Sequence, residues 1–124
     1  MTDNDIQSVI DSIKQNHFSE PELINLLKDD RALVRANVLM ALPRRSMTNP
    51  QRIVDAIAAA SEAANSQVKL MGTTTQRKLA IATLAWLGVD AARETFDRVI
   101  DTLSAGEREE IAELVRRGPI TSAN

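Results

Sequence analysis

The chain of 124 residues contains no cysteine and no tyrosine, and its only phenylalanine and tryptophan residues are Phe18, Phe96 and Trp86. The absence of cysteine excludes disulfides, thiolate metal sites and a cysteine nucleophile. Strands favour aromatic and β-branched residues in alternation, and no stretch of this sequence shows such a pattern. The apolar content is carried mainly by Ala, Leu, Ile and Val, and it predicts an all-α fold.

Long hydrophobic runs are also missing. No stretch approaches the roughly 18 apolar residues that span a bilayer. The first residues, MTDND, lack the basic start and apolar core of a secretory signal. We therefore expect a soluble cytoplasmic protein. The length indicates one domain over residues 1–118, followed by a frayed tail over residues 119–124.

Residues suited to catalysis are few. His17 is the single histidine, and no partner stands at the spacing of a metal site. A lone histidine near the end of a helix more often caps that helix than acts as a base. The glutamates within residues 109–113 are interleaved with arginines, which is typical of a solvated helix face. We expect no enzyme activity, no cofactor and no metal, with a glycosylase-like activity as the enzyme alternative.

Capping signals and helical periodicity divide the chain into segments. Ser19 and Ser104 are each followed by a glutamate at capping-box spacing. Asp30 is a favourable N-cap for the third segment, and Asn49 precedes a proline at the first position of the fourth. The predicted helices span about residues 3–15, 19–27, 31–42, 50–64, 76–87, 90–103 and 105–118.

The longest irregular stretch is Asn65–Thr75, which contains a glycine and three threonines. We expect this stretch to be a mobile or functional loop. The helix that follows, Gln76–Leu87, is apolar on nearly all sides, which indicates burial between neighbouring helices. Trp86 shares a face of this helix with leucines, so we expect it in the core.

Residues Leu23–Leu42 form one predicted helical hairpin with more apolar surface than it can bury alone. This hairpin resembles a HEAT repeat. Asp29 or Asp30 matches the turn aspartate of the family, and Val34-Arg35 matches the Val-Arg pair that opens the second helix. The resemblance is weaker over residues 50–88 and only generic in the last hairpin.

The resemblance implies a short right-handed α-solenoid of about three helical hairpins, with the second helices lining a concave face. It also implies that Asp30 and Arg35 hydrogen-bond as a ladder between repeats. Arg77 matches the same arginine in the second copy, although Gln76 replaces the expected valine. A plain globular helical bundle is the alternative architecture.

Charge is segregated along the chain. The formal net charge is −5 over residues 1–30, +6 over residues 31–89 and −3 over residues 90–124. If the second helices lie side by side, the central bases form a basic groove, which attracts an acidic partner. The residues that we predict to contact that partner are Arg44, Arg45, Lys69, Thr74, Arg77 and Lys78.

These observations predict a non-catalytic protein-binding module that uses a basic concave face. An adaptor or scaffold role is one form of this hypothesis, and an immunity or inhibitor protein for a toxic enzyme is another. Binding to a nucleic-acid backbone is the other alternative, because lysine and arginine release counterions from phosphates. The acidic pI of about 5.4 and the few aromatic residues weigh against it.

Overall fold

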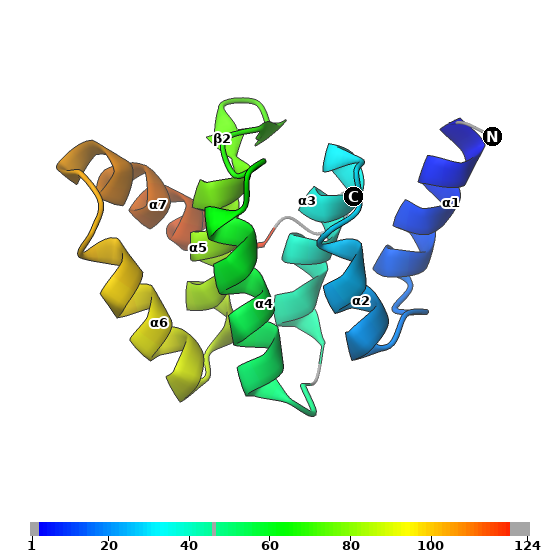
Figure 1. The fold of residues 1–124 in the computed structure, drawn as a ribbon, viewed down its shortest axis with the longest axis horizontal. Coiled ribbons are helices and arrows are strands. Elements are labelled where there is room, and N and C mark those ends of the chain that lie inside the picture. Colours follow the sequence, from blue (N-terminus) through cyan, green and yellow to red (C-terminus); the bar gives the residue numbers. More distant parts are fainter. Residues whose placement is uncertain (1–2, 46, 120–124) are drawn as a thin grey trace.

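The computed structural model describes residues 3–45 and 47–119. Within these ranges the chain forms seven α-helices, a 3-10 turn and one two-stranded hairpin (Figure 1). The all-α prediction is confirmed, and the predicted tail lies outside the described residues except for Pro119. The elements are α1 Asp3–Lys14, α2 Glu20–Leu26, α3 Ala32–Ala41, η1 Leu42–Arg44, α4 Pro50–Glu62, β1 Lys69–Met71, β2 Thr74–Thr75, α5 Gln76–Leu87, α6 Asp90–Ile100 and α7 Ala105–Arg117.

Most helix ends follow from the local capping chemistry. Ser19 and Ser104 each close a capping box with the glutamate three residues later, as predicted. The side chain of Asn49 accepts a hydrogen bond from the backbone N–H of Arg52 and caps α4. Gly88 ends α5 with a φ of 72°, a left-handed conformation that glycine adopts without steric cost. These ends agree with the sequence prediction.

The start of α3 differs from the prediction. Arg31, rather than Asp30, occupies the N-cap position, and it makes no side-chain capping bond. The carboxylate of Asp29 accepts a hydrogen bond from the backbone N–H of Arg31 at 2.9 Å, so an Asx-type turn precedes the helix. The turn chemistry therefore belongs to Asp29, and Asp30 is exposed.

The helices are arranged in two layers. α1, α3, α5 and α7 contact one another in that order, and α2, α4 and α6 form the second row, with α4 packed along α5 (Figure 1). Glu20, at the start of α2, accepts hydrogen bonds from the backbone at the start of α4, so these two helices begin at the same level. The right-handed sense of a solenoid stays a prediction.

α5 is the central helix of the stack. Eight of its twelve residues are buried, which confirms the expectation of a helix enclosed by neighbours. Most of the core lies between α3, α4 and α5, and a smaller cluster of Ile81, Leu103 and Ile111 joins α5 to α7. The indole N–H of Trp86 is half-buried and donates to the carbonyl oxygen of Val115 at 3.2 Å. In the described part of the chain, no helix has both the length and the apolar content to cross a membrane.

The stretch that we expected to be an irregular loop contains a β-hairpin. β1 and β2 pair antiparallel, with Lys69 opposite Thr75. The backbone N–H groups of Gln76 and Arg77 donate to the carbonyl oxygens of Val68 and Ser66 at 2.9 and 2.8 Å. The hairpin is thus bonded to the first turn of α5, and the prediction of no strand was wrong here.

Candidate functional site

Arg35 is a buried link between α3 and α5. Its side chain is 3% exposed. Nε donates to the side-chain oxygen of Gln76 at 2.6 Å, and Nη1 donates to the backbone carbonyl oxygen of Asp29 at 2.7 Å. Every one of these contacts lies inside the protein. Arg35 therefore joins α3 to α5 and offers almost no surface to a partner, and its role as a ladder residue between repeats stays a prediction.

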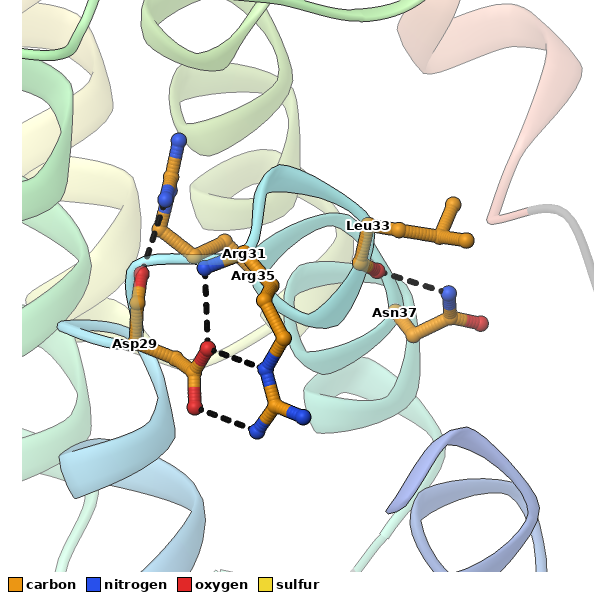
Figure 2. A network of polar contacts seen from close by, with 5 residues as sticks. All are labelled: Asp29, Arg31, Leu33, Arg35 and Asn37. Carbon is orange, nitrogen blue, oxygen red and sulfur yellow. Dashed lines mark hydrogen bonds and ion pairs between the residues drawn. The ribbon is translucent and has the colours of Figure 1, made fainter. Parts of the chain in front are cut away.

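Asp29 connects the two arginines of this turn. Figure 2 shows the guanidinium of Arg31 paired with both carboxylate oxygens of Asp29, while Arg35 reaches its backbone oxygen. The hydrogen bond from Arg31 is the largest influence on this carboxyl, and it holds the pKa of Asp29 below its ordinary value. The turn contacts that we expected from Asp30 are made by Asp29, and the ladder between repeats stays a prediction.

Gln76 completes the link and was not predicted as a site residue. It is 1% exposed. Its side-chain oxygen accepts the hydrogen bond from Arg35. Its amide nitrogen donates to the carbonyl oxygen of Ala60 and to the side-chain oxygen of Asn65, both at 2.9 Å. One carboxamide therefore joins α3, α4 and the segment before the hairpin. No signal in the sequence distinguishes Gln76 from the polar residues Arg77 and Lys78 that follow it in the first turn of α5.

Arg77 and Lys78, two of the predicted partner-binding residues, lie in the first turn of α5 and are half-buried. Nη1 of Arg77 donates to the carbonyl oxygen of Ser61 at 3.4 Å, and the ammonium of Lys78 pairs with Glu110 at 2.5 Å. The charges of both bases also contribute to lowering the pKa of Glu107, after the hydrogen bond from the Ser104 backbone. Two glutamates of α7 thus interact with these bases, Glu110 through an ion pair and Glu107 through its charge.

Lys69 and Thr74 lie nearby in the hairpin, with Lys69 exposed and Thr74 half-buried. Val68, which precedes β1, is 41% exposed, one of two large apolar side chains reported as exposed among the described residues. The other is Leu33, at 51%, on the side of α3 away from Asp29 in Figure 2. These exposed side chains are scattered singly, which is ordinary for a protein surface.

Arg44 and Arg45 lie at the other end of the stack. Arg35 and Gln76 bring the starts of α3 and α5 together, whereas Arg44 is the last residue of η1, which directly follows α3. Arg44 follows Arg35 by nine positions of helix, a distance of about 14 Å along the axis. The expected continuous groove formed by Arg44 and Arg77 is therefore absent from the described structure, because the two arginines occupy opposite ends of parallel helices.

An apolar groove lies between α2 and α4, with a volume of about 550 Å³. We call it the α2/α4 groove. Its floor and walls are mostly aliphatic, and the charged side chains among its lining residues are Lys28 and Asp55. The lining residues are Ile24, Leu27, Lys28, Asp55, Ala56, Ala59, Ala60, Ala63, Ala64 and Asn65.

The groove follows from two local features of the sequence. α2 and α4 begin at the same level, but α2 has 7 residues and α4 has 13, so α4 extends past the end of α2 by about 9 Å. Ala56 and Ala59 lie on α4 and Ala63 is its C-cap residue, and all three line the groove. Alanine side chains are too short to fill the space that a longer neighbour would occupy. This groove was not predicted from the sequence, because a run of alanines carries no chemical signature.

No group of three or more histidine, aspartate or glutamate side chains that could hold a metal ion occurs among the described residues. Comparisons of the chain with protein-family models, with curated proteins and with solved structures found no match. The HEAT resemblance therefore stays a prediction from the sequence.

Proposed function

We propose that this chain is a non-catalytic module that binds another protein, and that an amphipathic helix of the partner docks in the α2/α4 groove. The observation that supports this proposal is the groove itself. It is apolar, has a volume of about 550 Å³ and lies along the uncovered end of α4. Helical segments commonly bind by placing an apolar face in such a groove.

The floor of the groove suits a helix rather than an extended chain. Ala56 and Ala59 on α4 and Ala63 at its C-cap present small side chains, and the buried residues Leu27 and Ala60 line the same groove. Small residues let the axis of a second helix approach closely, and burial of its apolar side chains supplies the affinity. The uncovered length of about 9 Å accommodates between one and two turns of such a helix.

The charges at the rim of the groove restrict which charged side chains the partner helix can carry there. Lys28 comes from the α2 side and Asp55 from the α4 side, and both are exposed. A helix with an acidic residue on one flank and a basic residue on the other would complement these charges in one orientation only. Complementary rim charges give orientation and specificity more than affinity. The sequence predicted a partner with an acidic surface. The groove calls only for an acidic residue on the side of the partner helix that lies near Lys28.

The proposal is tested by site-specific photo-crosslinking in the cells that produce the protein. A photo-crosslinking residue replaces Ala59 in the groove, and a matched variant carries it in place of Glu94, which is exposed on α6. We expect one defined protein adduct from position 59 and none from position 94. The cross-linked segment, identified by mass spectrometry and synthesised as a peptide, should bind the purified chain in solution.

A blocking variant checks that the groove is the binding surface. Ala59→Lys places a long charged side chain over the groove and should weaken peptide binding at least about tenfold. Its folding should be little affected, because position 59 is exposed and Asp55 stands one turn earlier as an ion-pair partner. Absence of an adduct at position 59, or unchanged peptide binding by Ala59→Lys, would contradict the proposal. An adduct with a second copy of the chain would replace it by self-association.

A further inference from the structure

A second concavity lies at the end of the stack that holds Arg44, and its charge is of one sign. It has a volume of about 200 Å³ and lies between the end of α1 and the end of η1. The charged side chains among its described lining residues are Lys14, Arg44 and Arg45, all of them basic. We call these three residues the basic cluster. They come from two segments that are about thirty positions apart in the chain.

Helix dipoles account for part of this arrangement. Lys14 ends α1 and Arg44 ends η1, and cations are favoured near the carboxyl ends of helices. The dipole effect depends only on how close a charge lies to the end of the helix. It would favour these bases equally without a concavity and without a hydrogen bond. It does not explain the environment of the third base, Arg45.

Arg45 has a buried donor without an acceptor. Its Nη1 donates to the carbonyl oxygen of Phe18 at 2.6 Å, which fixes the guanidinium. Its Nε is buried and has no hydrogen-bond partner within the described part of the chain. Buried N–H groups are nearly always paired, and an unpaired one is costly. Arg45 is therefore held in place while one of its donors lacks an acceptor from the described protein.

The acidic residue whose charge acts on Arg45 is already engaged elsewhere. Glu20 is buried, and its carboxylate accepts hydrogen bonds from the backbone and hydroxyl of Thr48 and from the backbone of Asn49. Burial alone would raise the pKa of Glu20, but these bonds and the charge of Arg45 lower it. Among the residues that the structure describes, neither Arg44 nor Arg45 has an ion-pair partner. The carboxylate of Glu20 is thus already engaged, and the charged side chains that line the concavity are all basic.

From these observations we propose that the basic cluster binds a phosphate monoester group, either free or carried on a larger molecule. Arg44 and Arg45 are suited to donate to phosphate oxygens through their planar guanidinium groups, and Lys14 adds a point charge. A phosphate monoester carries a charge of about −1.5 to −2 at neutral pH, which suits a concavity whose charged lining residues are all basic. The volume of about 200 Å³ is below that of ordinary small-molecule pockets, so it admits an anionic group rather than a whole ligand. This inference does not depend on the α2/α4 groove.

Nitrogen-15 NMR of the arginine Nε–H groups tests the proposal directly. The intact protein is titrated with inorganic phosphate at constant ionic strength, with chloride as the reference salt. We expect a saturable shift of the Arg45 Nε–H signal. Arg44→Ala and Lys14→Ala should each weaken phosphate binding about tenfold, since each removes one charge-assisted contact. Both positions are exposed, so both variants should fold.

Arg98→Ala is the matched control, because Arg98 is an exposed arginine on α6, away from the cluster. This variant should bind phosphate as the unmodified chain does. An Arg45 signal that does not respond to phosphate would overturn the proposal. Equal weakening in Arg98→Ala would also overturn it, because it would indicate a general ionic effect.

Further titrations identify the source of the phosphate. Tighter binding of a phosphoserine peptide than of inorganic phosphate, with no binding of the unphosphorylated peptide, would assign the site to a modified side chain. Equal affinities for the two would assign it to free phosphate. Binding of duplex DNA with a steep salt dependence, together with no response to inorganic phosphate, would instead indicate a nucleic-acid backbone and would refute the monoester site.

Discussion

The buried contact between Arg35 and Gln76 predicts a specific pattern of unfolding free energies. The two side chains are 3% and 1% exposed, and they lie 2.6 Å apart, Nε to Oε1. We consider Gln76→Leu, Arg35→Met and the double variant, since leucine and methionine approximate the shapes of the residues that they replace. The single variants each leave a buried polar group without its partner, whereas the double variant removes both groups.

The expected magnitudes follow from the groups that lose their partners. Gln76→Leu leaves the charged Nε of Arg35 and the carbonyl oxygen of Ala60 without partners, and we expect it to cost about 3–5 kcal/mol. Arg35→Met leaves the carbonyl oxygen of Asp29 and the amide oxygen of Gln76 unpaired, which should cost about 2–4 kcal/mol. The double variant should lose about 1.5–3 kcal/mol less than the sum of the single losses.

Urea unfolding followed by far-ultraviolet circular dichroism measures these differences at neutral pH. Arg98→Met is the control, because the same substitution at an exposed arginine should change stability by less than about 0.5 kcal/mol. Additivity of the two single variants within about 0.5 kcal/mol would refute the reasoning, since it would mean that Arg35 and Gln76 do not stabilise each other.

Further predictions concern other parts of the fold. Val38→Asp should cost more than about 4 kcal/mol and unfold much of the population, because Val38 is 0% exposed and the variant buries an unpaired charge; near-normal melting in a thermal scan would contradict the predicted burial. Glu20→Gln should cost about 1.5–3 kcal/mol at pH 7, where the carboxylate is charged and accepts its hydrogen bonds. Since the pKa of Glu20 is lowered by folding, this difference should shrink as the pH falls below about 4.3 and through the folded-state pKa, and a difference that stays constant in urea titrations across this range would be evidence against it. Gly88→Ala should cost about 1 kcal/mol, because φ is 72° at the end of α5, and unchanged stability in the same assay would argue against the left-handed cap.

The parts of the fold that could be predicted are those set by local chemistry. Ser19, Ser104 and Asn49 cap helices through hydrogen bonds that span three residues, so their sequence spacing is sufficient. The β-hairpin was missed because its strands contain only three and two residues and are too short to show alternation. The hairpin is held by backbone hydrogen bonds from the start of α5, such as the one from Gln76 to Val68. Sequence periodicity does not predict such bonds.

The predicted basic groove failed for a geometric reason. The sequence correctly places Arg44 and Arg77 on elements of the same layer, but a groove also requires them to lie at the same height. Arg44 follows the end of one helix and Arg77 opens the next, and parallel stacking separates such positions by a helix length. Periodicity predicts the face of a helix on which a residue lies. It does not predict which end of that helix lies beside which end of another helix.

Trp86 has a consequence for how this protein can be studied. It packs against the large core, and its indole donates to Val115, a residue that packs against the smaller cluster joining α5 to α7. The fluorescence of this single tryptophan should therefore report whether the C-terminal helix is seated, as distinct from whether the whole chain is folded. An emission change that precedes the loss of helical signal on heating would reveal α7 detaching first, and no extrinsic label is needed to see it.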